Sequence, residues 1–418
     1  MQRITVPHEI PNLVARLQRH DESPNRQAPT LHEGLTKEDF ASLQLKALDL
    51  ARGGAYAEAR FTISRALAIN PLNARTHFLA GRIAEETLDF ESAALHYGCA
   101  LELDPKNEKF QFHVALNCFS RGRFGDGADL YRSRPSAAQH PDPLVCGLPR
   151  WRGEVMGGRI LLWAEQGLGD EILFLRMLPL IKAHWSRLLV EVDPRLKPVY
   201  EHNFPDIGFI DRGLPVQASD LVAQAPHGDL LSLFHRRITD PQLVGHRLAV
   251  PGGHQQAQKA LRNAFDGKQS VGISWLTMST VHPLMRSIPV QTLLQALSPK
   301  THVLVNLQYL APAEDLDLIE RAGFTLINRD EVDGYQDLVG LASLIAGVDK
   351  VLTIDNATAH LAGTLGADTV VLLPHLANWR WGRPGACVSW YPELRTFWQA
   401  SRGDWSSTVA AAKTELRL

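Results

Sequence analysis

Two segments of the chain carry side chains that could do chemistry. The first reads Gly167-Leu168-Gly169-Asp170 and stands between a predicted strand and a predicted helix. Its glycines let the backbone turn tightly and approach a ligand, although their spacing is not the full dinucleotide-binding fingerprint. The Asp170 carboxylate can cap the free N–H groups of the helix or act as a general base, and the residues alone leave both roles open.

The second segment follows a predicted buried strand, Val351–Ile354, and reads Asp355-Asn356-Ala357-Thr358 before a helix that carries His360. A strand, a short loop and a helix start present free N–H groups and the positive end of the helix dipole, which suits a phosphate or diphosphate. The Thr358 hydroxyl could add a donor. His360 could touch the ligand or orient the loop, and the alternative is a histidine satisfied within the core.

Two further polar residues follow neighbouring predicted strands. Arg286 comes after the loop 276–285 and could neutralise phosphate charge, or it is a solvated loop arginine. Gln308 ends the next strand and faces the same sheet edge, where it could read a base or ribose. Its alternative is a solvated glutamine at a strand end.

Two other patterns point less clearly to chemistry. Trp379-Arg380-Trp381 combines rigid aromatic rings with a guanidinium, and packing between two lobes explains it at least as well as ligand contact. Asp315-Leu316-Asp317 lies in an amphipathic stretch whose polar residues face water, and no histidine pair has the helical spacing of a zinc site. We therefore predict no metal ion and no resident cofactor.

The elements that must position these residues change along the chain. From about Gly157, short β-branched and leucine-rich runs alternate with amphipathic stretches, which predicts parallel sheets with helices on both faces. Two such blocks, 157–250 and 268–390, are separated by the Pro/Gly/Gln-rich segment 251–258. Two doubly wound lobes place ligands at the carboxyl ends of their strands. The predicted strands are 159–164, 187–192, 207–210, 270–275, 302–307, 325–327, 350–353 and 369–373.

Residues 38–135 repeat with a fixed period. ALAINP ends at Pro71 and ALELDP ends at Pro105, which is the 34-residue spacing of a tetratricopeptide repeat. Small residues at matched positions let paired helices approach, and each proline ends a second helix. We predict a helical array over 38–135, with a third, weaker copy, after a loose lead-in at 1–37; the alternative is a generic helical bundle.

Composition places the chain among ordinary globular proteins. Its 418 residues include 43 basic and 45 acidic side chains, so no global field favours nucleic acid. No run approaches the roughly 20 apolar residues that span a bilayer, and the start lacks the apolar core of a signal peptide. The 4 cysteines form no C-x-x-C pair. We expect a cytoplasmic protein with reduced thiols, no nucleic-acid partner and no stable membrane insertion.

The stretch from Arg159 to Gln399 resembles the heptosyltransferase-type glycosyltransferase domain of GT-B fold. The whole chain resembles bacterial proteins that join tetratricopeptide repeats to such a domain. The matching segments are LLWAEQGLGDEILFLRMLPL, LLVEVDPRL, VGISW, RSIPV, VNLQ, DLVGLASLIAGVDKVLTIDNATAHLAGTLG and NWRWGRPGACVSWYPELRTFWQ. The resemblance implies an α-helical array followed by two Rossmann-like lobes. The acceptor-side lobe would be 157–250, the nucleotide-sugar lobe 268–390, and a C-terminal helix within 391–418 would pack back on the domain.

The resemblance also implies an inverting, metal-independent transfer from a nucleotide sugar. It makes Asp170 the general base of an acceptor-side loop that includes Glu165, Gln166, Gly167 and Gly169. It places the donor and its diphosphate against Asp355, Asn356, Ala357, Thr358, His360, Arg286, Gln308 and Ser274. Relatives usually have glycine where Ala357 stands, and their loop after Trp275 is short and polar, so the identity of the donor stays open.

Three functions are compatible with this pattern. The first is a protein glycosyltransferase whose repeats dock an acceptor such as flagellin. The second is a heptosyltransferase-like enzyme that acts on lipopolysaccharide or another saccharide, although no basic or apolar amphipathic stretch suggests a membrane-associated acceptor. The third is a repeat scaffold with an inactive transferase domain, against which Asp170, Asp355 and His360 argue. We favour the first.

Overall fold

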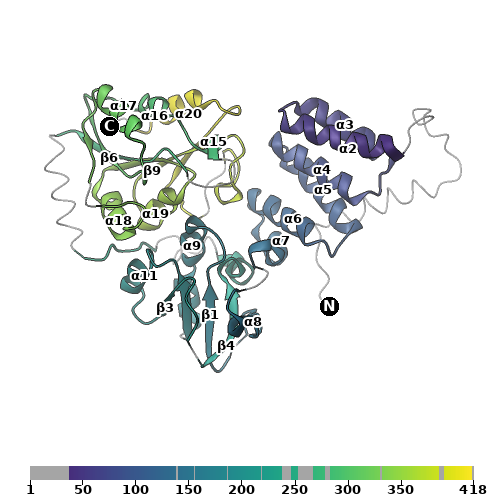
Figure 1. The fold of residues 1–418 in the computed structure, drawn as a ribbon, viewed down its shortest axis with the longest axis horizontal. Coiled ribbons are helices and arrows are strands. Elements are labelled where there is room, and N and C mark those ends of the chain that lie inside the picture. Colours follow the sequence, from purple (N-terminus) through teal and green to yellow (C-terminus); the bar gives the residue numbers. More distant parts are fainter. Residues whose placement is uncertain are drawn as a thin grey trace. The chain divides into compact units, whose positions relative to one another are not determined.

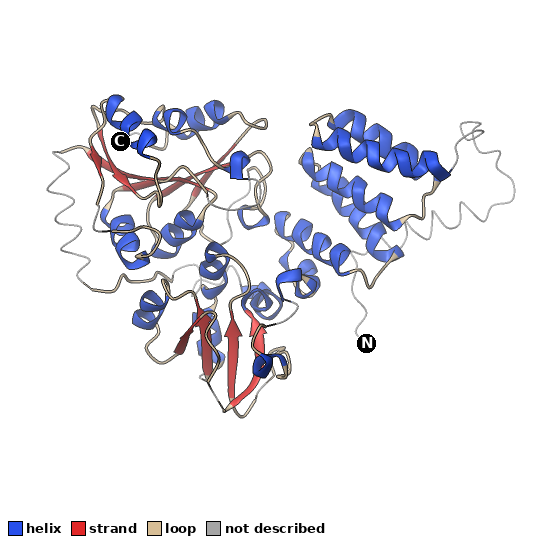
Figure 2. Ribbon diagram, viewed as in Figure 1, coloured by secondary structure: helices blue, strands red, loops and turns tan. Residues whose placement is uncertain are grey.

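The computed structural model describes residues 37–137, 140–154, 156–185, 187–217, 219–237, 246–252, 267–277, 283–329, 332–385 and 390–416. Apart from Lys37, the predicted lead-in lies outside these residues. The chain divides into two compact units, one of residues 1–138 with 378–382 and one of residues 139–377 with 383–418. Among the described residues, all strands belong to the second unit (Figure 2).

The first unit is a series of helix pairs (Figure 1). The second helices of successive pairs begin at Tyr56, Phe90 and Phe124, and the first helices of the last two pairs begin at Ala74 and Glu108. Successive starts are 34 residues apart, which confirms the predicted repeat. The helices are α2 (Lys37–Arg52), α3 (Tyr56–Ile69), α4 (Ala74–Glu86), α5 (Phe90–Leu103), α6 (Glu108–Ser120) and α7 (Phe124–Gly127), then the 3-10 helices η1 (Leu130–Ser133) and η2 (Pro135–Ala137).

Equivalent caps and close helix contacts build the repeat. Asn73 and Asn107, one period apart, each accept a hydrogen bond from the backbone N–H three residues on, at 2.9 and 3.3 Å. Gly81 on α4 faces the Tyr97 ring on α5, and a Cβ at Gly81 would lie 2.6 Å from that ring. The absence of a side chain at Gly81 therefore lets α4 and α5 pack this closely.

The second helix of the third pair, α7, has only four residues, and a distant segment of the chain packs against this pair. After the single turn of α7, the 3-10 helix η5 (Trp379–Trp381) packs against α6. The Trp379 ring centroid lies 5.0 Å from that of Phe119 and 5.8 Å from that of Tyr131. The Trp379-Arg380-Trp381 motif thus belongs to the helical unit, and Trp379 packs there instead of between the two lobes.

The second unit begins with a four-stranded parallel sheet in the order β3-β2-β1-β4. Its core gathers buried apolar side chains such as Leu161, Trp163 and Leu189. The strands are β1 (Arg159–Trp163), β2 (Leu188–Val192), β3 (Gly208–Asp211) and β4 (Leu221–Pro226). The helices are α8 (Pro143–Cys146), α9 (Leu168–Leu175), α10 (Leu178–His184), α11 (Lys197–Asn203) and α12 (Leu230–Phe234), with the 3-10 helices η3 (His227–Asp229) and η4 (His235–Arg237).

The second lobe is built on a six-stranded parallel sheet in the order β10-β9-β8-β5-β6-β7. Counted within the lobe this is 6-5-4-1-2-3, the strand order of a Rossmann sheet. Helices α16, α17 and α20 lie on one face and α18 and α19 on the other (Figure 1). The strands are β5 (Gln269–Ile273), β6 (His302–Asn306), β7 (Leu326–Ile327), β8 (Lys350–Ile354), β9 (Thr369–Leu373) and β10 (Arg395–Trp398). The helices are α15 (Pro283–Arg286), α16 (Val290–Leu294), α17 (Ala313–Arg321), α18 (Leu338–Gly347), α19 (Ala357–Leu365) and α20 (Trp405–Ala412).

A helical repeat array followed by two Rossmann-like lobes is the fold class predicted from the sequence, and it is confirmed. Two strands, β4 and β10, were not predicted, and both lie at sheet edges. The segment 391–418 holds β10 as well as α20, whose Trp405 and Val409 belong to the core of this lobe. Among the described helices, none has the length and apolar character needed to cross a membrane.

Candidate functional site

The predicted site residues gather where each sheet reverses its strand order. In the first lobe this point lies between β1 and β4, and the loop to α9 follows β1. In the second lobe it lies between β5 and β8, whose carboxyl ends continue into Ser274 and Asp355. Doubly wound sheets bind ligands at such switch points, outside the carboxyl ends of the strands.

The acceptor-side loop is fixed to the end of β4. Glu165 Oε1 accepts hydrogen bonds from the Gly228 backbone N–H and from Gln166 Nε2, each at 3.1 Å. Gly167 occupies the N-cap position of α9 without a side-chain cap, and Asp170 lies half-buried in the first turn of that helix. Glu165 and Gln166 thus support the loop, and Asp170 stands at its end.

Glu171, the residue after Asp170, is a second carboxyl group that the sequence did not single out. Its side chain is buried, and burial raises its pKa to about 8. Its Oε1 accepts a hydrogen bond of 2.6 Å from the Asp193 backbone N–H, just beyond β2. Glu171 therefore holds a proton at neutral pH and anchors α9 to the sheet, whereas its neighbour Asp170 is only half-buried.

In the second lobe a buried hydrogen-bond network joins the ends of β5, β6 and β8. Asn356 caps α19 by accepting from the Ala359 N–H at 3.2 Å, and its Nδ2 donates to Ser274 Oγ at 2.8 Å. Ser274 Oγ donates in turn to Gln308 Oε1 at 3.1 Å. That oxygen also accepts from two backbone N–H groups of the loop after β5, at 2.9 and 2.8 Å. Ser274 and Gln308 therefore shape the loop; their contact with a ligand stays a prediction.

Arg286 and Asp355 form a largely buried ion pair beside the start of α19. Arg286 Nε lies 3.0 Å from Asp355 Oδ2, and Arg286 Nη2 donates to the Asp355 carbonyl at 2.5 Å. The arginine side chain keeps 22% of its surface exposed, against 4% for the aspartate. Because a carboxylate repels a diphosphate, we interpret Asp355 as the residue that holds the guanidinium in place. Residues 278–282 of the preceding loop lie outside the described residues.

The first turn of α19 presents groups that could hydrogen-bond a ligand. Ala357 begins the helix, and Thr358 is buried with a hydroxyl that has no hydrogen-bond partner among the described residues. Leaving a buried hydroxyl unpaired is costly, and the first N–H groups of a helix also lack intrahelical partners. A ligand oxygen at this helix start would satisfy both kinds of group.

His360 brings the two loops together. It is buried, and burial together with the charge of Arg286 lowers its pKa to about 3, so its imidazole is neutral. Its Nδ1 lies 3.2 Å from the Tyr391 hydroxyl oxygen. On its other side it meets Gly169, where a Cβ would lie 2.8 Å from His360 Cδ2. The contact between α9 and α19 thus places the Asp170 loop next to the Asp355 loop.

Three residues of this region were missed in the sequence: Glu171, Arg176 and Tyr391. The Arg176 guanidinium carbon lies 4.8 Å from the centroid of the Tyr391 ring. Arg176 is an isolated cation in the apolar run ILFLRMLPL, and this isolation could have marked it as a functional residue. Glu171 and Tyr391 offered no comparable signal, because their importance depends on neighbours that are distant in the sequence.

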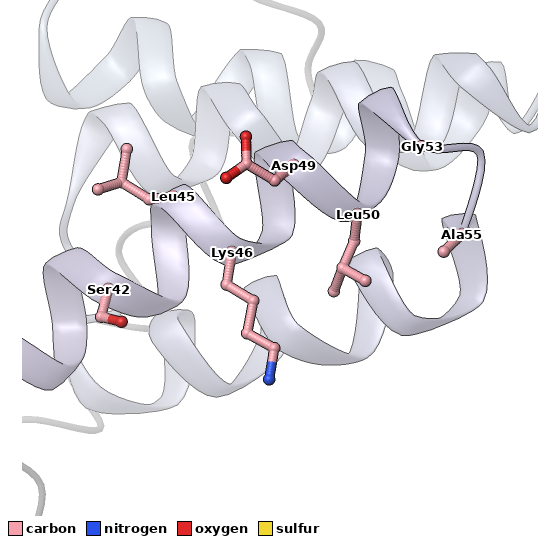
Figure 3. A pocket seen from close by; sticks show the side chains of 7 residues that line it. All are labelled: Ser42, Leu45, Lys46, Asp49, Leu50, Gly53 and Ala55. Carbon is pink, nitrogen blue, oxygen red and sulfur yellow. The ribbon is translucent and has the colours of Figure 1, made fainter.

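Neither a metal centre nor a second transferase site emerges from the described residues. Within the described ranges, no three His, Cys, Asp or Glu side chains are grouped so as to hold a metal ion. A groove of about 530 Å³ runs along one face of α2 in the helical unit (Figure 3). Its lining includes Lys46, Asp49 and Leu45, which is 57% exposed, but no predicted transferase residue.

Comparison with known proteins gives one similar curated sequence. No protein-family model matches the chain. The chain is 29% identical over 359 residues to Protein FlbA of Caulobacter vibrioides, an alignment that covers 81% of this chain. The chain spans 59% of the length of that protein, which is less than two thirds.

Among solved structures, the chain is similar to a glycosyl transferase of family 9 from Veillonella parvula. The identity is 14%, the TM-score 0.42, and the match covers 62% of this chain and 92% of that one. It is also similar to the ADP-heptose heptosyltransferase II of E. coli, with 12% identity, a TM-score of 0.41 and coverage of 62% and 98%. The fold assignment itself rests on the strand orders of the two sheets and on the helical repeat. A helical repeat array followed by two Rossmann-like lobes is the architecture that the predicted resemblance implies.

Proposed function

We propose that the chain is a glycosyltransferase that moves a sugar from a nucleotide sugar to a protein acceptor, with inversion at the anomeric carbon and without a metal ion. The contact between Gly169 and His360 is the observation that carries this proposal. It brings a carboxylate loop from one switch point beside an anion-binding helix start from the other. A transferase needs this juxtaposition, because the attacking hydroxyl and the leaving diphosphate must lie on opposite sides of one carbon atom.

The donor diphosphate binds at the start of α19 in this proposal. The N–H groups of Ala357 and Thr358, the Thr358 hydroxyl and the exposed part of Arg286 supply hydrogen bonds and positive charge. These groups are fixed before the reaction by the Asn356 network and by Asp355. Preorganised donors of this kind stabilise a leaving diphosphate and take the role that a metal ion has elsewhere.

Asp170 acts as the general base. Its carboxylate takes the proton of the acceptor hydroxyl while the hydroxyl oxygen forms a bond to the anomeric carbon. The bond between that carbon and the diphosphate oxygen breaks in the same step, and the electron pair leaves with the nucleoside diphosphate. A single displacement inverts the configuration. Glu171, protonated at neutral pH, is unsuited to the same role.

The helical unit selects the acceptor. Arrays of helix pairs present extended surfaces to peptides and proteins, and the repeat here covers α2 to α7. The alignment of 359 residues with Protein FlbA is longer than the second unit, so the similarity reaches into the helical unit. We favour a protein acceptor because arrays of helix pairs bind proteins, and flagellin is the first to test.

Intact-mass spectrometry tests the proposal. The purified chain is incubated with flagellin and a panel of nucleotide sugars in the presence of EDTA. We expect the acceptor to gain the mass of one or more sugar residues with the wild type and no mass with Asp170→Asn. Transfer to a free saccharide acceptor alone would show that the acceptor class is wrong. Equal transfer by wild type and Asp170→Asn would show that the base is wrong.

A further inference from the structure

Tyr391 lies between His360 of α19 and Arg176, a buried arginine of the other lobe. Its hydroxyl oxygen is 3.2 Å from His360 Nδ1, and the two rings are tilted by 57°. Its ring centroid is 4.8 Å from the guanidinium carbon of Arg176. All three side chains are buried. Gly363, one turn after His360, makes room for the ring, because a Cβ there would lie 2.5 Å from Tyr391 Cδ1.

Both ends of one short helix rest on this pair. Gly169 in the first turn of α9 touches the imidazole of His360, and Arg176 at the C-cap of α9 covers the phenol ring of Tyr391. The position of α9, which carries Asp170, is therefore coupled to the orientation of His360.

The chemistry of the contact selects one protonation pattern. A neutral imidazole has one N–H and one acceptor nitrogen, and a phenol can either donate to Nδ1 or accept from it. A cation over the phenol ring withdraws electron density and strengthens the O–H as a donor. Donation by Tyr391 leaves the proton of the imidazole on Nε2. The Nε2–Cδ2 edge is the one that faces Gly169, at 3.5 and 2.8 Å from the place of its absent Cβ.

We propose that Tyr391 is a positioning residue that donates its hydroxyl proton to His360 Nδ1, holds the imidazole as the Nε2–H tautomer, and aims that N–H at the loop 167–170. This inference deepens the proposed transferase function and rests on it for its catalytic meaning. The tautomer itself does not depend on any transfer activity. In this tautomer the Nε2–H group of His360 is a hydrogen-bond donor at the contact between the two lobes.

Nitrogen NMR of the full chain tests the tautomer directly. Histidines are labelled with ¹⁵N, and long-range ¹H–¹⁵N correlations of the ring are recorded from pH 5 to 8. The His360 signals are identified by their loss in His360→Gln. We expect the pattern of a neutral Nε2–H ring in the wild type, unchanged over this pH range. A neutral Nδ1–H pattern in the wild type would overturn the proposal before any variant is made.

Two variants separate positioning from structure. Tyr391→Phe should give a mixture of the two tautomers and weaken nucleoside diphosphate binding about five- to tenfold, as expected for one lost hydrogen bond. Tyr200→Phe is the matched control, because Tyr200 is also buried, and its hydroxyl has no hydrogen-bond partner among the described residues. It should leave the His360 signals unchanged.

The outcomes distinguish this inference from the proposed function. An unchanged tautomer in Tyr391→Phe refutes the positioning role. If no nucleoside diphosphate binds the wild type while the tautomer responds as expected, the proposed function fails and the hydrogen bond stands.

Discussion

Gly169 and His360 belong to different lobes and touch: a Cβ on Gly169 would lie 2.8 Å from His360 Cδ2. Real Cβ atoms do not approach a ring carbon this closely, so the contact exists only because residue 169 has no side chain. The contact holds the loop of Asp170 against α19, the helix whose start is proposed to bind the donor diphosphate. The proposed chemistry depends on that closeness.

Gly169→Ala should therefore impair transfer. Alanine favours a helix over glycine by about 1 kcal/mol, so propensity alone would stabilise α9. The new methyl group would instead push α9 from α19, and we expect kcat/KM to fall at least about tenfold, which corresponds to roughly 1.4 kcal/mol. Steady-state kinetics with the identified donor measures this.

Gly157→Ala is the control for that experiment. The residue lies before β1 and outside the site loop, it is exposed, and a new Cβ there would meet no heavy atom within 4 Å. We expect near wild-type activity. If the two alanine variants behaved alike, the interlobe contact would have no role in transfer.

The adjacent carboxyl groups Asp170 and Glu171 should differ sharply in their contribution to activity. Asp170→Asn removes the proposed base, and we expect a loss on the order of 10²–10⁴ in kcat. Glu171→Gln preserves the acceptor for the Asp193 N–H and mimics the protonated acid, so we expect a change of less than about threefold at pH 7. A larger loss of activity in Glu171→Gln than in Asp170→Asn would show that Asp170 is not the base.

Glu171 also makes stability depend on pH. Burial raises its pKa to about 8 from an ordinary 4.5, so the folded state binds its proton more tightly than the unfolded chain. The free energy of unfolding contributed by this group is greatest below about pH 4.5, falls as the pH rises towards 8, and is constant above. The fall is on the order of a few kcal/mol.

Urea denaturation of wild type and Glu171→Gln from pH 5 to 9 isolates this effect. The free energy of unfolding of the wild type should fall relative to that of Glu171→Gln as the pH rises from 5 to about 8, and the difference should level off above that pH. Parallel curves would mean that Glu171 is ionised in the folded protein.

The helical unit offers an independent test of its packing. Gly81→Ala places a methyl group 2.6 Å from the Tyr97 ring, and we expect overpacking to cost about 1–3 kcal/mol of unfolding free energy. Gly53→Ala is the control in the same unit, because its Cβ would meet its nearest atom, the Asp49 carbonyl oxygen, at 3.4 Å. Thermal unfolding followed by circular dichroism measures both. A greater loss in Gly53→Ala would contradict the observed packing of α4 on α5.

Much of this architecture could be predicted from the sequence because its signals are local. The spacing of Pro71 and Pro105 revealed the repeat, and the buried runs before Gly167 and Asp355 marked the strands whose ends form the site. The two missed strands lie at sheet edges, where burial is incomplete. In β4, Pro226 also argues against a strand by composition, although a sheet edge tolerates it.

The relations between distant residues could not be predicted in the same way. The ion pair of Arg286 with Asp355, the hydrogen bond of Tyr391 to His360 and the burial of Glu171 depend on contacts made only in the folded chain. Gln308 illustrates the limit. Its place at a strand end is predicted, but not the three hydrogen bonds that its side-chain oxygen accepts from the loop after β5 or the one that its amide donates to the Tyr309 carbonyl.

Calorimetric titration with nucleoside diphosphates in EDTA tests the central claim most directly. The claim is that the start of α19, with Arg286, binds a diphosphate without a metal ion. We expect one of ADP, UDP, GDP, CDP and dTDP to bind the wild type at 1:1 stoichiometry. Arg286→Gln should weaken that binding about ten- to hundredfold. Arg321→Gln, at an exposed position on α17, should leave it unchanged. Failure of all five to bind, or binding that is equal in wild type and Arg286→Gln, would contradict the account.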